Sequence, residues 1–600
     1  MRAMKIVSAL ALLAAIPCAA AVSGEAVYQR RCAACHDSNA ERTPPRAALQ
    51  QLSVARILRT LDFGVMVNIA NTLDREEREA VAGYLGVQRK DDVPVPPEAY
   101  CKDRNVTIGS ASNAGWNGWS IDPANTRYAA ASGIALSQVS KLKLKWAYAF
   151  NGDVTAFGAP SLVGNTLFVG SAGGAVQALS TDFGCVRWVY QADGPVRSAI
   201  VAVPNGKTHV LVFTDLIGRA YGVEAETGKL LWKKKPEPHE STKLTGSAAV
   251  HNGIVFIPAA SWEETRATNP DYPCCTFRGS VTALRAKDGS EVWKTYTIRE
   301  TPKQIEKGGV GTWGPSGASI WGTPTVDAKR GLLYVATGDN FSTPATDLSD
   351  AIVALDLKNG KIVWSKQVTP GDVFSGSCSG KCPGPDYDFG SSVIVEKLPN
   401  GRDILLAGQK SGVVYAFDPD RKGDILWQTR VGKGGTNGGV QWGMASDGQN
   451  VYAAVSDLIR KGAKPGGMAV GLPPDPEQGG GLTALRISSG EKAWYAAPPP
   501  CGPLPGCSQA QPAAVTAIPG VVFSGSDDGH LRAFAAEDGH MLWDFDTARD
   551  FQTVNGVQGK GGSLDGAGPV IASGMLFVNS GYARNGGIPG NVLLAFAPEQ

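Results

Sequence analysis

The stretch Cys32-Ala-Ala-Cys35-His36 is the first in the chain whose residue types and spacing could do chemistry. In the pattern C-x-x-C-H, two thiols attach a porphyrin covalently and the adjacent histidine is placed to ligate the iron, so the pattern predicts haem c. A zinc site would need a third and a fourth ligand, and residues 22–100 contain no other Cys or His. A thioredoxin-like C-x-x-C would require a βαβ context, which is absent here.

A methionine offers the second axial ligand of that iron. Met66 follows His36 by 30 residues and is the only methionine between the N-terminal leader and residue 443. It precedes a helical pattern, and in this it resembles small bacterial cytochromes c, in which a Gly-x-Met loop comes before the last helix. A His/Met pair raises the haem potential and suits electron transfer. The alternative is a methionine that fills the core.

Two cysteines, Cys274 and Cys275, are adjacent in the sequence. Their Cα atoms would lie about 3.8 Å apart across a trans peptide, closer than in ordinary disulfides, so a bridge would be strained and is expected to be functional. The other cysteines can form three further bridges: Cys378 with Cys382, Cys501 with Cys507, and Cys101 with Cys185, the two that are left. These four pairs and the two haem cysteines account for every cysteine after the leader.

The N-terminus predicts an oxidising compartment. Residues 1–21 have the parts of a secretory signal: basic Arg2 and Lys5, an apolar run from Ile6 to Ile16, and a small-residue cleavage site at Ala19–Ala21. The apolar run is shorter than the roughly 20 residues that a membrane anchor needs. We therefore expect a protein secreted to the periplasm, where disulfides persist. The balance of 57 basic and 55 acidic residues argues against a nucleic-acid binder.

One phrase recurs seven times after about residue 140: a short apolar strand, a polar turn that usually holds Gly, and a strand ending in Trp. The tryptophans are Trp188, Trp232, Trp293, Trp364, Trp427, Trp494 and Trp543. Further strand-like runs between them give about four strands per unit, the pattern of a β-propeller blade. KLKLKWAYAF near the start and NVLLAFAP at the C-terminus make the two halves of an eighth phrase.

The sequence therefore predicts an all-β, eight-bladed propeller over residues 112–600. A small all-α cytochrome c domain is expected over residues 22–90, and a Pro-rich linker over residues 91–111.

The recurring phrase resembles the tryptophan-docking repeat of the eight-bladed quinoprotein alcohol dehydrogenases, over roughly residues 112–598. The N-terminal position of the cytochrome and the segments SWEE and CCTFRG look most like the polyvinyl alcohol dehydrogenase family of quinohaemoproteins. The resemblance implies an enzyme with pyrroloquinoline quinone (PQQ), haem c and Ca²⁺ that oxidises secondary alcohol groups of polyvinyl alcohol to ketones. It also implies that electrons pass from PQQ to haem c and then to an external cytochrome c.

The same resemblance implies a set of site residues. Asp388 is implied as the catalytic base and as a Ca²⁺ ligand, and oxygen ligands suit this hard cation. The other implied Ca²⁺ ligands are Glu263, with Glu264 as a competitor, and Asn340, with Asp339 as the alternative. For PQQ, the implied contacts are Arg197 and Lys410 against its negative charge, Thr245 as a hydrogen-bond partner and Trp321 stacked on the quinone.

Two departures from the family pattern stand out. In methanol dehydrogenases, a vicinal disulfide over PQQ lies just before the arginine that matches Arg197, whereas Cys274 and Cys275 follow the Glu263 loop. A cap over PQQ is still expected, because this loop leaves the same face as Glu263. Gln441-Trp442 replaces an Asn-Trp pair, which puts a PQQ contact there in doubt.

Two other functions compete with this interpretation. The same chemistry could act on small alcohols, or the propeller could be a non-catalytic scaffold like outer-membrane assembly factors with related repeats. A scaffold needs no electron exit, so the haem motif, Glu263 and Asp388 favour the enzyme. Stoichiometric binding of PQQ would separate the two classes.

Overall fold

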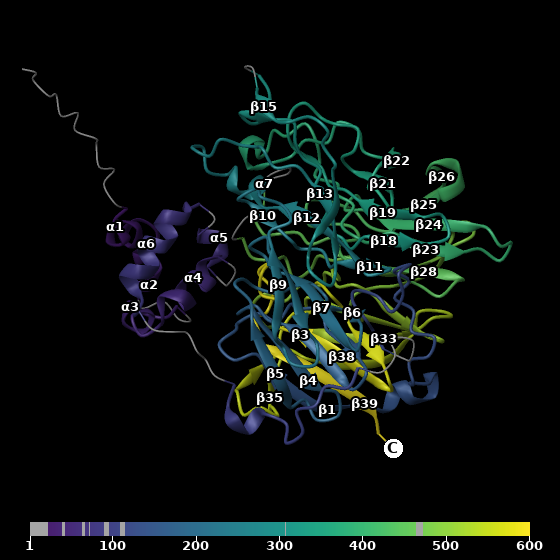
Figure 1. Cartoon of the computed structure of the whole chain (residues 1–600), viewed down its shortest axis with the longest axis horizontal. Helices are drawn as coiled ribbons and strands as arrows, with labels where there is room; N and C mark the ends of the chain where they lie inside the picture. Colours follow the sequence, from purple (N-terminus) through teal and green to yellow (C-terminus); the bar gives the residue numbers. More distant parts are fainter. Residues whose placement is uncertain are drawn as a thin grey trace, which may run out of the picture. The chain divides into compact units, whose positions relative to one another are not determined.

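A computed structural model of the 600-residue chain describes residues 22–38, 43–62, 66–70, 72–88, 95–108, 115–305, 308–463 and 472–599 (Figure 1). The predicted leader, residues 1–21, lies outside these ranges. Backbone contacts divide the chain into two compact units, Met1–Leu61 with Leu73–Asp91, and Asp62–Thr72 with Asp92–Gln600. In the described ranges, no helix has both the length and the apolar character that crossing a membrane requires.

The first unit is helical, as predicted. Its helices are α1 (Gly24–Arg31), α2 (Ala33–His36), α3 (Arg46–Leu49), α4 (Val54–Asp62) and α6 (Arg75–Leu85), while the short α5 (Val67–Ala70) belongs to the segment Asp62–Thr72. The Ser23 side chain accepts from the Ala26 N–H at the start of α1. A capping box between Asp74 and Glu77 begins α6, which explains why the chain turns helical there.

The second unit is built from eight antiparallel sheets, one of which carries a short fifth strand. The first three sheets are β2 (Ser161–Val163), β3 (Thr166–Gly170), β4 (Ala175–Ser180) and β5 (Val186–Gln191); β6 (Val201–Asn205), β7 (Thr208–Thr214), β8 (Ala220–Glu224) and β9 (Leu230–Lys234); and β10 (Thr242–Lys243), β11 (Ala249–His251), β12 (Ile254–Ser261), β13 (Ser280–Arg285) and β14 (Glu291–Tyr296). The short helix α7 (Glu263–Arg266) lies between β12 and β13.

The next four sheets continue in chain order. They are β18 (Thr325–Asp327), β19 (Leu332–Ala336), β21 (Ala351–Asp356) and β22 (Ile362–Gln367); β23 (Ile394–Lys397), β24 (Asp403–Gly408), β25 (Val413–Asp418) and β26 (Asp424–Arg430); β27 (Ala445–Ser446), β28 (Asn450–Val455), β29 (Gly481–Arg486) and β30 (Lys492–Ala496); and β31 (Thr516–Ile518), β32 (Val521–Gly525), β33 (His530–Ala535) and β34 (Met541–Asp546). Two-stranded sheets are added by β15 (Lys303–Gln304) with β16 (Trp313–Gly314), β17 (Ser316–Gly317) with β20 (Asn340–Ser342), and β35 (Asp550–Phe551) with β36 (Gly559–Lys560).

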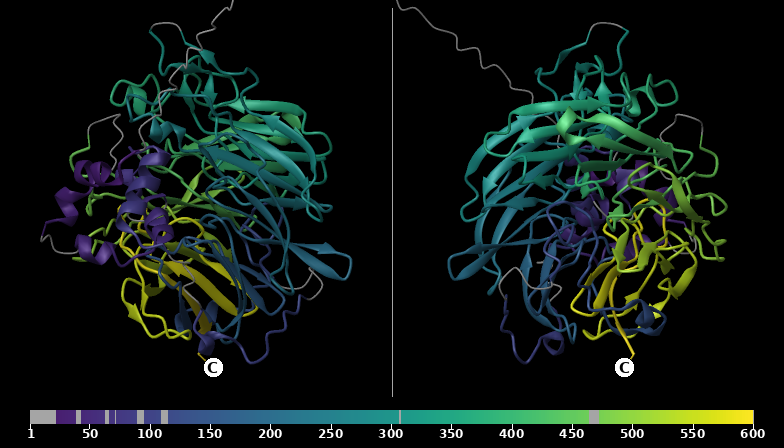
Figure 2. Two further views of the ribbon diagram at one scale, coloured as in Figure 1. Left: turned by 60° about the vertical axis from the view of Figure 1, so that its left-hand side comes forward. Right: turned by 90° about the vertical axis from the view of Figure 1, so that its right-hand side faces the viewer.

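The eighth sheet joins the two ends of the propeller. Strand β1 (Leu142–Ala149) pairs with β39 (Val592–Pro598), which continues to β38 (Met575–Ser580) and β37 (Val570–Ala572). Leu142 lies opposite Pro598 and Ala149 opposite Val592. Figure 2 shows the sheets following one another around the ring in order of colour until blue meets yellow. The predicted eight blades and their closure are confirmed, because the first strand of the propeller pairs with the last.

The recurring tryptophan ties each blade to the next one. Nε1 of Trp188 donates to the carbonyl of Ala225 at 3.0 Å, and Nε1 of Trp427 donates to that of Ile487 at 2.9 Å. The turn glycine of the next phrase packs on the indole. A Cβ at Gly490, whose φ is 74°, would lie 2.5 Å from Trp427, so the repeat requires glycine there for both space and conformation.

Candidate functional site

The predicted haem residues lie within a single helical turn. The backbone N–H groups of Cys35 and His36 both donate to the carbonyl of Cys32, and both cysteines are free thiols. Nδ1 of the buried His36 lies 2.8 Å from the carbonyl oxygen of Pro44. An N–H at Nδ1 donates to that oxygen and leaves Nε2 as the available iron ligand. These residues fit covalent haem attachment.

Met66, the predicted second axial ligand, lies in the turn that begins α5. Its carbonyl accepts from the N–H groups of Ile69 and Ala70, and its side chain is half-buried. Met66 and His36 belong to different compact units. Ligation by Met66 therefore stays a prediction.

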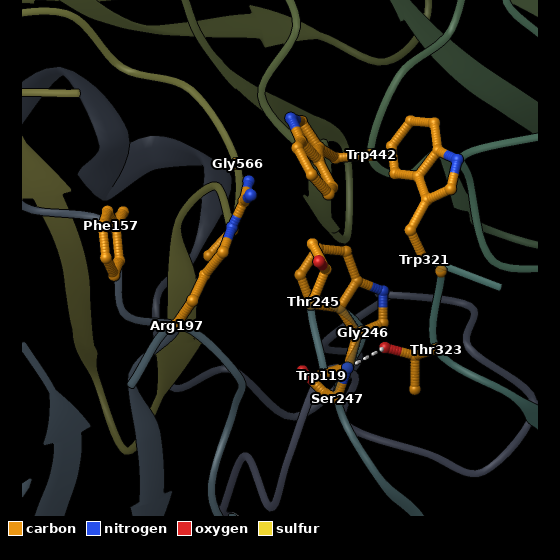
Figure 3. A pocket seen from close by; sticks show the side chains of 12 residues that line it. Trp119, Phe157, Arg197, Thr245, Gly246, Ser247, Trp321, Thr323, Trp442 and Gly566 are labelled. Atoms are coloured by element: carbon orange, nitrogen blue, oxygen red, sulfur yellow. Dashed lines mark hydrogen bonds between the residues drawn. The ribbon is translucent and has the colours of Figure 1, made fainter. Parts of the chain in front are cut away.

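A cavity of about 200 Å³ lies among the propeller loops. Its wall contains Arg197, Thr245, Trp321, Asp388 and Lys410, so the structure brings together the predicted base and all four predicted PQQ contacts. A smaller hollow of about 20 Å³ shares three of these residues, and Figure 3 shows Arg197, Thr245, Trp321 and Trp442 around it.

The cavity residues come from one end of successive blades. Arg197, Trp321 and Asp388 lie just before the first strand of their sheets, and Thr245 lies between the short strands β10 and β11. Glu264, Asp339 and Lys410 lie in connections between the second and third strands. Because neighbouring strands run in opposite directions, these two kinds of connection emerge at the same end of the propeller.

Asp388 is held by three donors. Its Oδ2 accepts from Nζ of Lys410 at 2.8 Å and from Nε1 of Trp321 at 3.0 Å. Its Oδ1 accepts from the backbone N–H of Asp339 at 2.8 Å. A Cβ at Gly338 would lie 2.4 Å from Oδ1, so glycine is needed for this close approach of backbone and carboxylate. The carboxylate is thereby fixed in one orientation.

Asp386, which the sequence analysis did not single out, completes a buried charge cluster. Nζ of Lys410 lies 2.7 Å from its Oδ1, so one ammonium is shared between two carboxylates. Carboxylate oxygens of Asp339, Asp386 and Asp388 all lie within 4.8 Å of one another. The only signal for Asp386 in the sequence is its place two residues before Asp388.

The cluster sets the protonation of its members. Burial acts to raise the pKa of Asp388, but the Lys410 ammonium outweighs it and holds this pKa below its usual range. Burial raises the pKa of Asp386 well above its usual range, with Lys410 opposing and Asp388 adding to the rise. Burial would lower the pKa of Lys410, but Asp386 and Asp388 raise it well above its ordinary value. Asp388 is therefore the ionised carboxylate of the cluster.

The two neighbouring glutamates, Glu263 and Glu264, have different surroundings. The carboxylate of Glu263 is fully buried and accepts from the Tyr272 hydroxyl at 2.9 Å and from the N–H groups of Thr276 and Phe277 at 2.8 and 2.7 Å. Its side chain anchors the following loop and is not part of the described cavity wall. Glu264 lines the cavity instead, and burial raises its pKa to about 7, with Lys410 opposing.

Asn340 is likewise held by hydrogen bonds within its own loop. Its amide donates to the carbonyl of Ser316 and to the hydroxyl of Thr346, both at 3.1 Å, and its Oδ1 accepts from the Thr346 N–H at 2.8 Å. These bonds hold Asn340 in the loop. Asp339 lines the cavity, and burial together with the charge of Asp388 raises its pKa well above the usual range.

All four predicted disulfides are present, including the bridge between adjacent Cys274 and Cys275. Both of these cysteines are buried, in an apolar cluster with Phe277 and Phe341. Of this cluster, Phe341 lines the cavity, whereas neither cysteine does. The bridge therefore lies behind the described cavity wall, in the loop that Glu263 anchors, and the expected cap over the cofactor stays a prediction.

Gln441 and Trp442, whose contact with PQQ was in doubt, both line the cavity. The Trp442 ring lies 4.9 Å from that of Trp321, nearly perpendicular to it. Its Nε1 donates to Oδ1 of Asp565 at 2.7 Å. The sequence analysis also missed Trp262 and Arg584, two further wall residues; Arg584 comes from the loop before β39.

Three observations test whether these residues fit the expected ligands. Nη2 of Arg197 is buried and has no hydrogen-bond partner within the described ranges, which suits an anionic group in the cavity. Trp321 and Trp442 offer aromatic surfaces to a planar ring. The carboxylates of Glu264, Asp339 and Asp388 offer the oxygen donors that a hard cation prefers. The wall therefore fits a planar anionic quinone beside a cation.

Comparison with protein families finds three matches. Residues 116–428 match the β-propeller domain of glucose, ethanol and alcohol dehydrogenases that use PQQ, and residues 277–588 match outer membrane protein assembly factor BamB. Residues 19–85 match cytochrome c oxidase, cbb3-type, subunit III.

Two curated relatives match almost throughout. A polyvinylalcohol dehydrogenase of Pseudomonas sp. is 40% identical over 96% of this chain and 93% of its own length. A polyvinylalcohol dehydrogenase of Sphingopyxis sp. (strain 113P3) is 37% identical with the same coverage. Among solved structures, quinohemoprotein alcohol dehydrogenase ADHIIG from Pseudomonas putida HK5 superposes with a TM-score of 0.61 at 20% identity, over 84% of this chain and 83% of that one. That structural likeness concerns the fold.

Proposed function

The chain belongs to the polyvinyl alcohol dehydrogenase family of quinohaemoproteins, and from this premise we propose that it oxidises secondary alcohol groups of polyvinyl alcohol to ketones. It is a PQQ-dependent alcohol dehydrogenase, with PQQ and haem c as cofactors. The observation that carries the proposed chemistry is the buried, ionised Asp388 in a cavity with the expected cofactor contacts. The polymer as substrate rests on the likeness over the whole chain.

In the proposed reaction, Asp388 accepts the proton of the substrate hydroxyl. Its Oδ2 already accepts two hydrogen bonds, from Lys410 and Trp321, whereas its Oδ1 accepts one, from Asp339. A carboxylate oxygen has two lone pairs, so Oδ1 keeps one for the incoming proton. Lys410 keeps Asp388 ionised until the alcohol arrives, which is the state that a general base needs.

Several wall residues would hold the cofactor. Arg197 would balance its negative charge, and Lys410 would donate its third N–H to it. Thr245 would hydrogen-bond it, and Trp321 would pack on its ring. When bound, PQQ accepts the two electrons of the alcohol, and a cation beside it polarises its carbonyl group. The protein supplies the position, the base and the exclusion of water.

For Ca²⁺ we propose Glu264 and Asp339 as ligands, with Asp388 beside them. All three line the cavity, whereas the side-chain oxygens of Glu263 and Asn340 accept hydrogen bonds from the surrounding loops. Asp386 lies close to Asp339 and Asp388, and the Lys410 ammonium already compensates it.

The proposed route of electrons leads from PQQ to the haem c on Cys32, Cys35 and His36, with Met66 as the second iron ligand, and then to an external cytochrome c. The proposed location is the periplasm. A leader of secretory pattern and four disulfides support it, because disulfides persist in oxidising compartments.

The test is the visible spectrum of the haem-loaded protein with PQQ and Ca²⁺, to which polyvinyl alcohol is added in one cuvette and 2-propanol in another. Haem reduction by the polymer that requires PQQ is the expected result. Reduction by 2-propanol alone would replace the polymer with small alcohols as substrate. Bound PQQ without reduction by either alcohol would refute the proposed substrate or electron route, and failure to bind PQQ would return the propeller to a scaffold.

A further inference from the structure

Two arginines line the cavity without an acidic partner. Neither Arg197 nor Arg584 forms an ion pair within 4.0 Å or a side-chain hydrogen bond with the described part of the chain. The charge of Asp565 acts on both arginines, but its carboxylate is hydrogen-bonded elsewhere: Oδ1 accepts from Trp442 and Gly566, and Oδ2 accepts from Asn585 at 3.3 Å. The two guanidinium groups therefore bring to one cavity positive charge that no directly bonded carboxylate pairs.

Each arginine is instead supported by a tryptophan. Cζ of Arg197 lies 3.8 Å from the ring centroid of Trp442, and Cζ of Arg584 lies 3.6 Å from that of Trp262. A guanidinium on an aromatic face gains a cation–π attraction, while its N–H donors, which lie in the guanidinium plane, stay available. Stacking thus fixes the orientation of both groups without using their hydrogen-bonding capacity.

Lys410 shows the contrast within the same cavity. Its ammonium is hydrogen-bonded to Asp386 and Asp388 and is neutralised by them. A ligand gains little electrostatic attraction from a cation that is already paired. The unpaired positive charge of the described wall therefore comes from the loops that carry Arg197 and Arg584. Tyr582, two residues before Arg584, lines the same cavity.

We propose that Arg584 is a second carboxylate-binding residue for the cofactor, and that it acts together with Arg197. The inference rests on the proposed function, because the proposed substrate is an uncharged polyol and the carboxylates of the reaction are those of PQQ. A bidentate guanidinium–carboxylate pair gives both charge and geometry, and it suits a donor plane that a tryptophan already orients. No sequence signal marked Arg584.

The electrostatics of the free cavity agree with this role. Burial lowers the pKa of Arg584 to about 10, and the like charge of Arg197 lowers it further, while Tyr582 and Asp565 oppose the shift. Keeping two partly desolvated cations in one cavity costs free energy in the absence of an anion. A bound carboxylate removes that cost, so the charge pattern favours the loaded protein.

The test measures PQQ affinity of the haem-containing, PQQ-free protein by ultrafiltration, without an activity assay. Arg584→Gln is expected to weaken binding by about 10- to 100-fold, as is usual for loss of a hydrogen-bonded charge pair. Arg584→Lys keeps the charge without the planar fork and should lose less. Arg549→Gln, which removes an arginine stacked on Phe545 outside the cavity, is the matched control and should bind as the parent does.

A second arm uses the trimethyl ester of PQQ, whose carboxylates are neutralised. The parent and Arg584→Gln are expected to bind the ester equally. Unchanged affinity of folded Arg584→Gln for PQQ would overturn the inference and leave the proposed function intact. A loss confined to the KM of an alcohol that carries a carboxylate would assign Arg584 to substrate and would also overturn it. Absence of PQQ binding by the parent would instead overturn the proposed function.

Discussion

The ammonium of Lys410 lies 2.8 Å from Oδ2 of Asp388, and both side chains are buried. The pair lets a carboxylate stay ionised in a desolvated place, since burial alone would raise its pKa. Lys410 is in turn kept charged by Asp386 as well as Asp388. The proposed base therefore depends on a lysine 22 residues further along the chain.

Replacement of the proposed base should slow turnover strongly without loss of PQQ binding. Asp388→Asn keeps an oxygen that can accept from Lys410 and Trp321 but cannot take the substrate proton, so PQQ-dependent haem reduction should slow by about 10²- to 10⁴-fold. The rate is measured in a single turnover after PQQ binding has been verified. Asp182→Asn, at an exposed acid of the propeller, is the matched control. A rate within threefold of the parent would exclude Asp388 as the base.

Substitution of each of the two neighbouring glutamates should show which one stabilises the fold and which one binds the metal. In Glu263→Gln, an NH₂ group replaces one of the two oxygens that accept from the N–H groups of Thr276 and Phe277. The loss of this hydrogen bond should lower the free energy of unfolding by about 2–3 kcal/mol and lower the Tm. Glu264→Gln should leave the Tm unchanged or raised, because it removes one charge from an acidic cluster, and should weaken Ca²⁺ binding at least ~10-fold.

Calorimetry gives both readings, since it reports the Tm and, by titration, the Ca²⁺ affinity of each variant. Each glutamate variant serves as the control for the other. The opposite pattern, with Ca²⁺ affinity lost in Glu263→Gln and kept in Glu264→Gln, would restore the family-derived expectation for Glu263.

Met66→Ala tests the second axial ligand of the haem. A thioether ligand raises the haem potential, so its loss should lower the midpoint potential and change the visible spectrum of the reduced protein. A spectroelectrochemical titration measures both. Met575→Ala, in the propeller sheet that holds β38 and β39, is the methionine control. If potential and spectrum match those of the parent, another residue ligates the iron.

His530 should make stability depend on pH. Its Nδ1 lies 2.7 Å from Oδ1 of Asp544, and this hydrogen bond raises the pKa of His530, with burial opposing. Asp528 adds to the rise and Arg532 opposes it. A raised folded-state pKa gives stability that is fully present below the unfolded pKa of about 6.5 and is lost as the pH rises through the folded pKa.

His530→Gln should therefore destabilise the propeller at pH 5.5 by about 0.5–1 kcal/mol and have less effect at pH 8.5. Thermal melts at the two pH values measure this difference. His251→Gln, which has no ion pair within the described ranges, is the control and should show no such dependence. An equal loss of stability at both pH values would show that the charge of His530 contributes nothing.

The architecture was readable from the chain because its physical causes are local and repeated. Most blades place a tryptophan on the glycine turn of the next phrase, as Trp427 does on Gly490, whereas Trp543 at the ring closure donates to the carbonyl of Leu142. Such a unit leaves similar residues at successive repeats. The C-x-x-C-H pattern and the disulfide partners were likewise readable, because they lie at short spacings or are the last cysteines left to pair.

The identity of individual site residues was decided by the tertiary structure. Glu263 and Glu264 are adjacent, and so are Asp339 and Asn340, so a sequence pattern cannot say which side chain turns toward the cavity. Glu263 accepts hydrogen bonds from the loop that carries Cys274 and Cys275, and Asn340 accepts one from Thr346. Glu264 and Asp339 line the cavity instead. Arg584 joins Arg197 only because the ring closes through β1 and β39. The repeat determines which loops converge, and the hydrogen bonds within each loop decide which of its residues reach the site.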